Sequence, residues 1–375
     1  MLLNSIKGNK EGITIAKNIL TILDIIWKFD FENTKKYAKI YTIIIRLRKL
    51  INSRFLFKLN DMNFIYYTYK KFYDKGEYLM LYSKDFKDYE LLDMADGQKL
   101  EKWGEYILIR PDPQIVWKEK QKPELWKKAH AKYVRSSTGG GHWEMLKGIN
   151  HDWKIKYKDL SFNIKPMGFK HTGLFPEHAV NWDLMIEKIQ TEKKKRNTDI
   201  KVLNLFAYTG GATVACAYAG ASCCHVDSSK GMVAWAKENI ASSGLKDRPV
   251  RFIVDDVVKF VKREIRRNNK YDVIIMDPPS YGRGANGEVW SIEKDLYDLV
   301  NLCADLLSDK PILFAINTYT GGLSGTVISN VLELVMNKKR PDLLKKAKIV
   351  TNEIGIKMKD SNLVLPCGIT TKWEI

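Results

Sequence analysis

Three features that would each assign this sequence to a familiar class of protein are missing from it. Its five cysteines include no Cys-x-x-Cys pair, so neither a zinc ribbon nor a thioredoxin-type site is expected and no metal is predicted. An odd cysteine count without a secretory signal fits a reducing cytoplasm. No apolar run is long enough to cross a bilayer, since the run 41–45 is followed at once by Arg46 and Arg48. We therefore expect a cytoplasmic protein that is neither disulfide-stapled nor anchored in a membrane.

Proline and histidine are missing from the start of the chain. Every proline lies at Pro111 or later and every histidine at His130 or later, although prolines usually punctuate the turns of a domain. Helical periodicity before Met80 places several residues on one face: Ile15, Ile19, Ile22, Leu23 and Ile26. We interpret 1–79 either as a helical N-terminal extension that grips RNA or a partner, or as translated upstream sequence. The second reading is favoured because a recognisable domain begins just after Met80.

Negative charge is in short supply relative to positive charge. The chain has 62 Lys and Arg against 44 Asp and Glu, a formal net charge of +18. Such an excess suits a polyanion such as RNA, because neutralising phosphates releases counterions; a solubilising lysine-rich surface is the alternative. The stretch 117–135 interleaves basic residues with Trp117, Trp126 and Tyr133. Its aromatics either stack bases or anchor a solvated loop to the core. RNA is the partner that we expect.

Short strand-like runs mark 80–170 as a small β-rich region, which we expect to bind RNA or substrate. The runs 106–109 and 115–117 are apolar and are separated by a Pro-Asp-Pro turn. The glycine-rich segment 136–142 is reminiscent of a phosphate cradle. It lacks the Gly-Lys-Ser/Thr ending of a P-loop, and no apolar helix follows it. We predict a flexible turn there.

Strand and helix alternate regularly from about residue 198. Apolar runs predict strands at 201–206, 221–226, 250–254, 271–276 and 312–317. Helical spacing predicts helices at 211–219, 231–242, 257–267, 294–307 and 326–338. The tail from Lys348 predicts two further strands joined by a turn near 359–361. Repeated βα units predict an α/β domain with a parallel, doubly wound sheet, to which the final hairpin adds an antiparallel strand.

A glycine-containing loop follows the first of these strands. The segment 204–211 reads Asn-Leu-Phe-Ala-Tyr-Thr-Gly-Gly. Its glycines let the backbone approach a ligand closely, and the following helix offers free N–H groups. The spacing is not Gly-x-Gly-x-x-Gly, so a nicotinamide dinucleotide is disfavoured.

Acidic residues follow the next three strands. The second strand ends at Asp227, whose carboxylate can accept both hydroxyls of a ribose. The third ends at Asp255 and Asp256, one of which can accept a hydrogen bond from an adenine amino group. The fourth ends in Asp-Pro-Pro-Ser at 277–280. Each signal alone is weak, because strand-end loops hold Gly and Asp for turn reasons. Together the four strand ends form a specific constellation.

The loop 206–211, taken with 277–280, resembles the class I methyltransferases related to the cytosine C5 and guanine N7 methyltransferases of bacterial 23S ribosomal RNA. The segment 170–178, Lys-His-Thr-Gly-Leu-Phe-Pro-Glu-His, is similar to the Lys-Thr-Gly-x-Phe/Tyr segment that precedes the cofactor domain of that family. The resemblance covers about 85–375. It implies a Rossmann-like seven-stranded sheet of order 3-2-1-4-5-7-6 within 171–375, with S-adenosylmethionine as the cofactor.

The resemblance also implies roles for individual residues. The cofactor-binding set that it implies is Phe175, Phe206, Tyr208, Thr209, Gly210, Gly211, Asp227, Ser228, Asp255, Asp256 and Asp277. Within that set Asp227 takes the ribose, Asp256 takes the adenine amino group, and Phe175 closes over the cofactor. Asp277 and Pro278 face the transferred methyl group as the catalytic residues. His178 stands where relatives often have Gln.

The cysteines bear on which atom is methylated. Methylation at cytosine C5 needs a cysteine nucleophile, expected after the proline of the fourth strand or at the end of the fifth. Those places read Pro-Pro-Ser at 278–280 and Asn-Thr-Tyr-Thr at 317–320. We expect the remaining candidates to pack within strands: Cys223, Cys224 and Cys367. A nitrogen acceptor is therefore favoured over cytosine C5.

The predicted substrate contacts follow the fourth strand: Pro279, Ser280, Tyr281 and Arg283. Tyr281 would stack on a flipped base, and Arg283 would meet phosphate from a flexible loop at 281–284. The leading hypothesis is methylation of a base in ribosomal RNA. The alternatives are methylation of a protein or small molecule on the same fold, and a non-catalytic RNA-binding relative.

Overall fold

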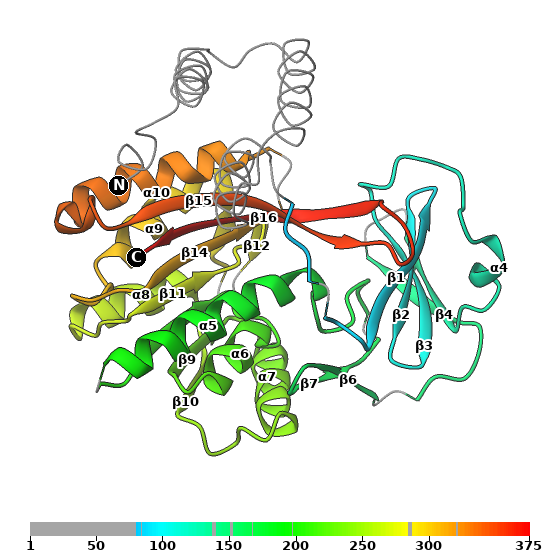
Figure 1. The fold of residues 1–375 in the computed structure, drawn as a ribbon, viewed down its shortest axis with the longest axis horizontal. Coiled ribbons are helices and arrows are strands. Elements are labelled where there is room, and N and C mark those ends of the chain that lie inside the picture. The colour runs from blue at the N-terminus through cyan, green and yellow to red at the C-terminus, as the bar shows by residue number, and fades with distance from the viewer. Residues whose placement is uncertain are drawn as a thin grey trace, which may run out of the picture. The chain divides into compact units, whose positions relative to one another are not determined.

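The computed structural model describes residues 80–375 except 84, 137–139, 151–152, 167, 197, 284–286 and 320–321. Both interpretations of 1–79 lie outside the described residues. The described part is built around a five-stranded sheet and a seven-stranded sheet, which lie toward opposite sides of the view in Figure 1 and meet where a long hairpin of the second sheet reaches the first. None of its helices is both long enough and apolar enough to cross a membrane.

The five-stranded sheet follows the chain in order. Its strands are β1 (Tyr89–Ala95), β2 (Gln98–Trp103), β3 (Tyr106–Pro111), β4 (Ala131–Arg135) and β5 (Gly141–Met145). The short helix α4 (Pro123–Trp126) leads into β4, which runs parallel to β3, while the other neighbours are antiparallel. The turn between β1 and β2 uses Asp96 and Gly97 at φ 50° and 70°, the left-handed geometry typical of two-residue hairpins.

Two predictions in this region are corrected by the structure. The run 115–117 is not a strand, because its carbonyls bind the β1–β2 turn instead of a neighbouring strand: Gly97 N donates to Ile115 O at 2.9 Å and Asp96 N to Trp117 O at 2.7 Å. The predicted turn at 136–142 is wrong at its end, because Gly141 already begins β5. The run 106–109 is confirmed as β3.

The seven-stranded sheet lies in the second half of the chain. Its strands are β8 (Lys201–Leu205), β9 (Ser222–Asp227), β10 (Val250–Val254), β11 (Val273–Met276), β14 (Leu313–Thr318), β15 (Lys348–Lys357) and β16 (Val364–Glu374). They are ordered β10-β9-β8-β11-β14-β16-β15. The first five are parallel, and β16 is antiparallel to both of its neighbours. The α/β class with a parallel-rich central sheet is confirmed.

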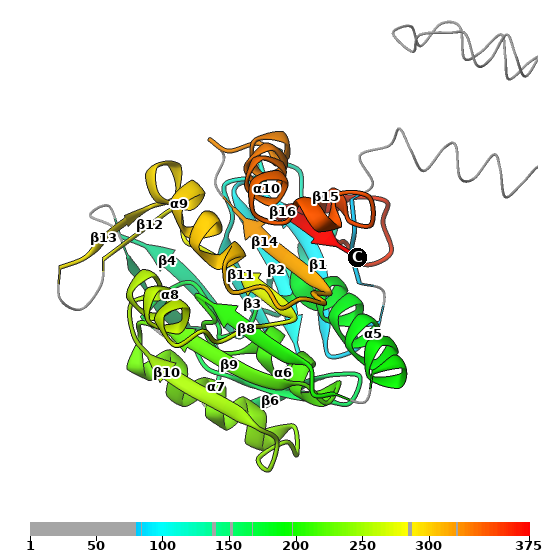
Figure 2. The same cartoon turned by 90° about the vertical axis from the view of Figure 1, so that its left-hand side faces the viewer.

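Helices cover both faces of this sheet (Figure 2). They are α5 (Ala179–Lys195), α6 (Gly211–Tyr218), α7 (Lys230–Ser242), α8 (Val257–Arg266), α9 (Ile292–Ala304) and α10 (Gly325–Lys339). Successive strand residues point to opposite faces. Val202 therefore packs with α5 and α6, whereas Leu203 packs with α8, α9 and α10. Helix α5 was not among the predicted elements.

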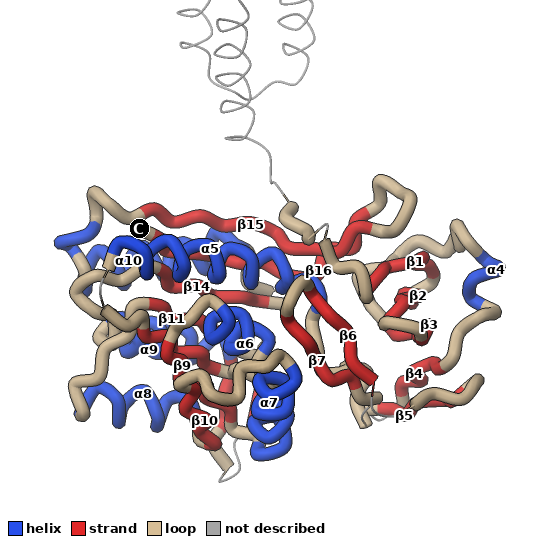
Figure 3. The backbone as a smooth tube through the Cα atoms, turned by 60° about the horizontal axis from the view of Figure 1, so that its bottom comes forward, coloured by secondary structure: helices blue, strands red, loops and turns tan. Residues whose placement is uncertain are grey.

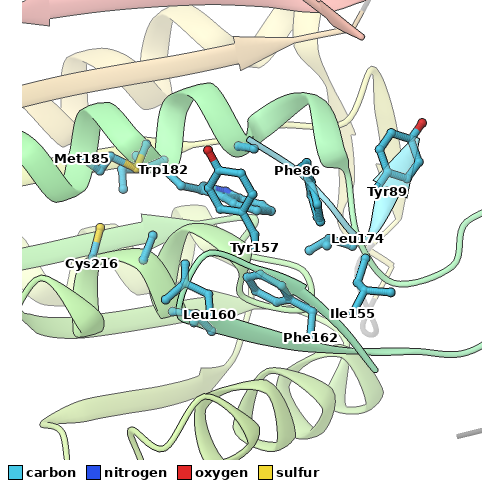
Figure 4. Close-up of a cluster of buried hydrophobic side chains, with 14 of the residues drawn as sticks. Phe86, Tyr89, Ile155, Tyr157, Leu160, Phe162, Leu174, Trp182, Met185 and Cys216 are labelled. Atoms are coloured by element: carbon cyan, nitrogen blue, oxygen red, sulfur yellow. The ribbon is translucent and has the colours of Figure 1, made fainter. Parts of the chain in front are cut away.

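The hairpin of β6 (Trp153–Tyr157) and β7 (Leu160–Ile164) lies between the two sheets (Figure 3). Tyr157 and Phe162 are fully buried there, and their rings lie 5.6 and 5.1 Å from that of Trp182 on α5. Figure 4 shows these rings with Phe86 and Leu174 in one apolar cluster. The cluster fixes α5, and with it the short 3-10 turn Pro176–His178 that precedes it.

Candidate functional site

The loop after β8 is held in a conformation that few side chains adopt freely. Phe206, Tyr208 and Gly210 have φ of 53°, 50° and 83°, and a left-handed residue other than glycine costs roughly 1–3 kcal/mol. Ala207 N compensates by donating to Val226 O at 3.0 Å. The Thr209 hydroxyl donates to Gly173 O in the segment before α5. The loop is thus pinned from β9 and from the chain upstream.

Glycine is also required at the start of α6 because a side chain there would collide with neighbouring helices. A Cβ on Gly211 would lie 2.9 Å from Trp182 Cζ2, and one on Gly210 would lie 3.0 Å from Ala236 Cβ. Trp182 belongs to α5 and Ala236 to α7, so both of these helices pack closely against the backbone of the loop. The loop residues from Phe206 to Thr209, together with Gly211, line a pocket.

Asp227 ends β9 and closes the loop. Its Oδ2 accepts a hydrogen bond from Tyr208 N at 2.9 Å, and its Oδ1 accepts one from Ser229 N at 2.8 Å. Burial raises the pKa of Asp227 above its ordinary value, although these two amides act to lower it. Ser228, next in the chain, is exposed. The carboxylate retains further lone pairs for hydroxyl donors.

Asp255 and Asp256 lie at the end of β10. Asp256 caps α8, with its Oδ1 accepting from Lys259 N at 2.9 Å. Asp255 is paired with Arg263 and also accepts from Asp256 N at 2.8 Å. Both carboxylates are half-buried at the same sheet edge as Asp227. Of the two, Asp255 is the one held by a cation.

Asp277 directly follows β11 and meets His178 and Tyr319. Its Oδ2 lies 3.4 Å from His178 Nε2, and that nitrogen also hydrogen-bonds with the Tyr319 hydroxyl. Among the residues that the structure describes, Asp277 Oδ1 is buried and has no hydrogen-bond partner. Burying a carboxylate oxygen without a donor is costly. Such an atom indicates a site that awaits a donor.

A pocket lies between the loop after β8 and the ends of β11 and β14, and its lining does not include Asp227, Asp255 or Asp256. Asp277 lines it together with Phe175, Tyr208, Thr209 and Asn317. The Phe175 ring lies 5.4 Å from that of Tyr208 and 6.0 Å from that of Tyr319. Phe175 and Tyr319 therefore place aromatic rings opposite the loop.

The segment after Asp277 differs from its prediction. Tyr281–Arg283 is not a flexible loop but the strand β12, paired with β13 (Val289–Ser291). Trp290 Nε1 donates to Pro279 O at 2.7 Å, and Ile292 N donates to Ser280 O at 3.1 Å, so the hairpin is fastened at its base. Tyr281 is 56% exposed and accepts a hydrogen bond from Arg283 Nε at 3.1 Å. Neither residue lines the pocket.

The aromatics of the basic stretch 117–135 serve the fold. Trp117 Nε1 donates to Met94 O at 2.7 Å, and Trp126 Nε1 donates to Asp93 Oδ2 at 2.8 Å. Tyr133 is 3% exposed. These rings therefore anchor the stretch to the sheet, while lysines such as Lys118 and Lys127 remain exposed.

The three cysteines considered as nucleophiles lie within strands, as predicted. Cys223 and Cys224 are buried on β9, and Cys367 lies on β16. Burial raises the pKa of all three thiols, that of Cys224 to about 11. A thiol becomes a good nucleophile only when its pKa falls. None of the three lines the pocket.

Sequence reasoning missed the partners of His178. Asn181 Nδ2 lies 3.1 Å from His178 Nδ1, 2.9 Å from Thr370 Oγ1 and 3.3 Å from Asn317 Oδ1. Thr370 comes from β16, far along the chain. Asn317 and Tyr319 were visible at the end of the fifth strand, where only a cysteine was sought.

Known proteins share this architecture. A family model described as S-adenosylmethionine-dependent methyltransferase matches residues 132–322. The crystal structure of the SAM-dependent methyltransferase from Agrobacterium tumefaciens superposes with a TM-score of 0.72 at 32% identity, over 79% of this chain and 93% of that one.

Curated relatives named ribosomal RNA large subunit methyltransferase K/L are also similar. The protein from Shewanella frigidimarina is 34% identical over 176 residues, 44% of this chain and 23% of the relative. That from Colwellia psychrerythraea is 27% identical over 238 residues, 59% of this chain and 31% of the relative. The chain thus spans about a quarter of the length of the curated relatives it matches. From the family model and the Agrobacterium structure, the chain belongs to the S-adenosylmethionine-dependent methyltransferases.

Proposed function

We propose that this methyltransferase acts on a base of ribosomal RNA, with a nitrogen atom as the acceptor. The observation that carries the proposal is the convergence of the loop 206–211, Asp227 and Asp277 at one edge of a parallel sheet. The similarity to relatives named for ribosomal RNA supports the substrate class. The net charge of +18 supports it too. The five free thiols suit a reducing cytoplasm.

The residues present fit S-adenosylmethionine. The strained loop lines the pocket, and the buried Asp277 Oδ1 has no hydrogen-bond partner among the described residues. In our proposal Phe206, Tyr208, Thr209 and Gly210 hold the methionine portion, with Phe175 closing over it. Asp227 with Ser228 holds the ribose, and Asp256 holds the adenine. Asp255, being paired with Arg263, positions α8.

The cofactor supplies an activated methyl group when it is bound. The protein then has to place an acceptor atom in line and exclude competing water. We assign that placement to Asp277 and Pro278 at the end of β11. Pro279 and Ser280 are held by the base of the hairpin, and they carry Tyr281 and Arg283 outward to meet the RNA beyond the pocket. Exposed lysines such as Lys118 and Lys127 would contact phosphates.

A labelling experiment tests the substrate class. The protein is incubated with S-adenosylmethionine carrying a tritiated methyl group and with unmodified transcripts of the ribosomal RNAs, and the nucleosides are then separated. We expect label in one nucleoside of one transcript, methylated at nitrogen. Label at C5 of cytosine would overturn the choice of acceptor. Label that survives ribonuclease and stays with added protein would favour a protein substrate instead.

A further inference from the structure

His178 is a titratable side chain beside Asp277 for which the proposed reaction has not yet provided a role. It is 7% exposed and lies in the 3-10 turn that precedes α5. Its Nε2 faces Asp277 Oδ2 at 3.4 Å and the Tyr319 hydroxyl. The imidazole therefore joins the ends of β11 and β14 to the start of α5.

The neighbours of His178 determine which nitrogen carries the proton. Thr370 donates its hydroxyl to Asn317 Oδ1 at 2.8 Å, so Thr370 Oγ1 accepts from Asn181 Nδ2 at 2.9 Å. Asp277 Oδ2, which can only accept when ionised, faces His178 Nε2 at 3.4 Å, so Nδ1 is the accepting nitrogen of a neutral imidazole. Asn181 Nδ2 therefore donates to His178 Nδ1 at 3.1 Å. A neutral imidazole then holds its proton on Nε2, toward Asp277 and Tyr319.

This arrangement occupies one carboxylate oxygen of Asp277 with His178 and leaves the other oxygen for a further donor. Oδ2 is engaged by His178, whereas the buried Oδ1 has no partner among the described residues, and Asp277 lines the pocket. We propose that neutral His178 is a positioning residue, which fixes Asp277 so that Oδ1 accepts a hydrogen bond from an N–H group of the substrate base. The inference rests on the proposed function, because a base is the donor that it invokes.

Protonation of His178 would disturb this arrangement. A second hydrogen, on Nδ1, would oppose the amide hydrogens of Asn181, which must then turn away from Asn317 and Thr370. The positive charge would also make Asp277 a weaker acceptor. Methyl transfer should therefore fail as His178 becomes charged.

The charges around His178 set where this happens. Burial lowers the pKa of His178, but the hydrogen bond and charge of Asp277 and the charge of Glu177 raise it more, so that it lies above the ordinary value. The charges of Lys99 and Arg110, in the five-stranded sheet, act in turn to lower the pKa of Glu177. The other titratable groups at this point are Tyr319, beyond β14, and Cys367 on β16, whose pKa values are both raised by burial. The loss of activity should thus begin above the pH at which an exposed histidine titrates.

The first test is the pH profile of kcat on whichever ribosomal RNA transcript is methylated. Wild-type kcat should fall about tenfold per pH unit below the pKa of His178. His178→Gln donates an N–H to Asp277 but does not titrate. Its kcat should be several-fold lower at pH 8 and then stay flat down to pH 6. His178→Phe removes the donor, and its kcat should fall roughly 10- to 100-fold at every pH.

His171 is the matched control. It also lies beside Phe175, with ring centroids 5.1 Å apart. Burial and the charges of Arg110 and Lys170 lower its pKa to about 3, so it stays neutral throughout the range tested. His171→Gln should keep the wild-type acid limb. A limb that persists in His178→Gln, or disappears in His171→Gln, would overturn the proposal.

Two measurements do not depend on turnover. Nuclear magnetic resonance of the free protein should show His178 titrating above pH 6.5, and at lower pH in Asp277→Asn. The same titration in both proteins would refute the coupling. The affinity for S-adenosylhomocysteine, measured by calorimetry, should stay within about threefold in His178→Gln. A larger loss would assign His178 to cofactor binding instead.

These readouts separate the two proposals. If no ribosomal RNA is methylated but the titration shifts in Asp277→Asn, the assigned substrate is wrong and the His178–Asp277 coupling stands. If RNA is methylated with an identical pH profile in wild type and His178→Gln, the assigned substrate stands and the proposed role of His178 is wrong.

Discussion

Two buried charged clusters in this molecule differ in how completely their carboxylates are hydrogen-bonded. In the five-stranded sheet, Glu101 accepts hydrogen bonds from Arg110 Nε at 2.6 Å, from another guanidinium nitrogen of Arg110 at 2.8 Å, and from the Tyr89 hydroxyl at 2.7 Å. After β11, Asp277 interacts with His178, at 3.4 Å from Oδ2, and with Tyr319, while its buried Oδ1 has no hydrogen-bond partner among the described residues. One carboxylate is saturated by the fold, and the other is not.

The difference separates a structural role from a functional one. A buried carboxylate with both oxygens paired rigidifies its surroundings. One that lacks a donor is a local cost that folding alone does not reward. Arg110 also donates to Lys170 O at 3.2 Å, just upstream of Gly173, whose carbonyl pins Thr209. The Glu101–Arg110 cluster therefore supports the segment from Lys170 to His178, which lies beside Asp277.

Breaking the saturated cluster should have the largest effect on stability. Arg110→Met leaves Glu101 buried without its main partner, which typically costs about 3–5 kcal/mol. Thermal unfolding measured by circular dichroism should show this loss. Lys127→Met, from an exposed pair with Glu124, is the control and should change stability by less than about 0.5 kcal/mol. Equal losses in the two variants would contradict the structural role of Arg110.

Removing the unsaturated carboxylate should instead damage catalysis. Asp277→Ala should reduce kcat on the order of 10²- to 10³-fold, as for the loss of a preorganised polar group, with little change in thermal stability. Asp342→Asn, at a pair where Asp342 is 58% exposed, serves as the control in the same methylation assay. Undiminished transfer by Asp277→Ala would refute its assigned role.

Acid should also distinguish the clusters. Burial raises the pKa of Glu101, but Arg110 and Lys99 lower it more, to about 2 from 4.5. A lowered pKa contributes stability that is present above pH 4.5 and lost as the pH falls toward 2, on the order of 3 kcal/mol. Denaturant titrations across this window should show the loss in wild type and much less of it in Glu101→Gln. If Glu101→Gln loses as much stability as the wild type over this pH range, the acid sensitivity arises from other groups.

The smallest expected effect concerns the loop that both clusters support. Gly211→Ala sets a methyl group against Trp182 and should cost about 1–3 kcal/mol of stability. It should also weaken binding of S-adenosylhomocysteine in calorimetry. Gly231→Ala is the matched control, because its new methyl group meets only Ser229 Oγ at 3.9 Å, within α7. If both substitutions behave alike, the loop is not packed as described.

Much of the architecture could be predicted because its signals are local. Val250–Val254 was predicted with the observed bounds of β10. The strand-end acids converge because parallel strands end at one edge. Helix α5 was missed although Trp182, Met185 and Ile189 are buried at helical spacing, since it ends in a polar Thr-Glu-Lys run that hides the pattern.

The polar partners of the site could not be predicted in this way. Asn181 and Thr370 are 189 residues apart in sequence, and neither carries a local pattern that pairs it with the other. The hairpin at Tyr281 was misread for a related reason. Its Tyr-Gly-Arg-Gly run suggested mobility, but Trp290, further along the chain, holds its base.

The position of β16 has a consequence for the order of folding. It lies between β14 and β15 in the sheet, but it follows both along the chain. Beyond the sheet, the same hairpin reaches back to Leu81 and Leu91 through bridges with Ile354 and Met358. Until β16 inserts, β15 lacks its strand neighbour and Asn181 lacks Thr370. Such long-range closure is slow, so the chain should acquire its secondary structure well before it acquires a competent pocket.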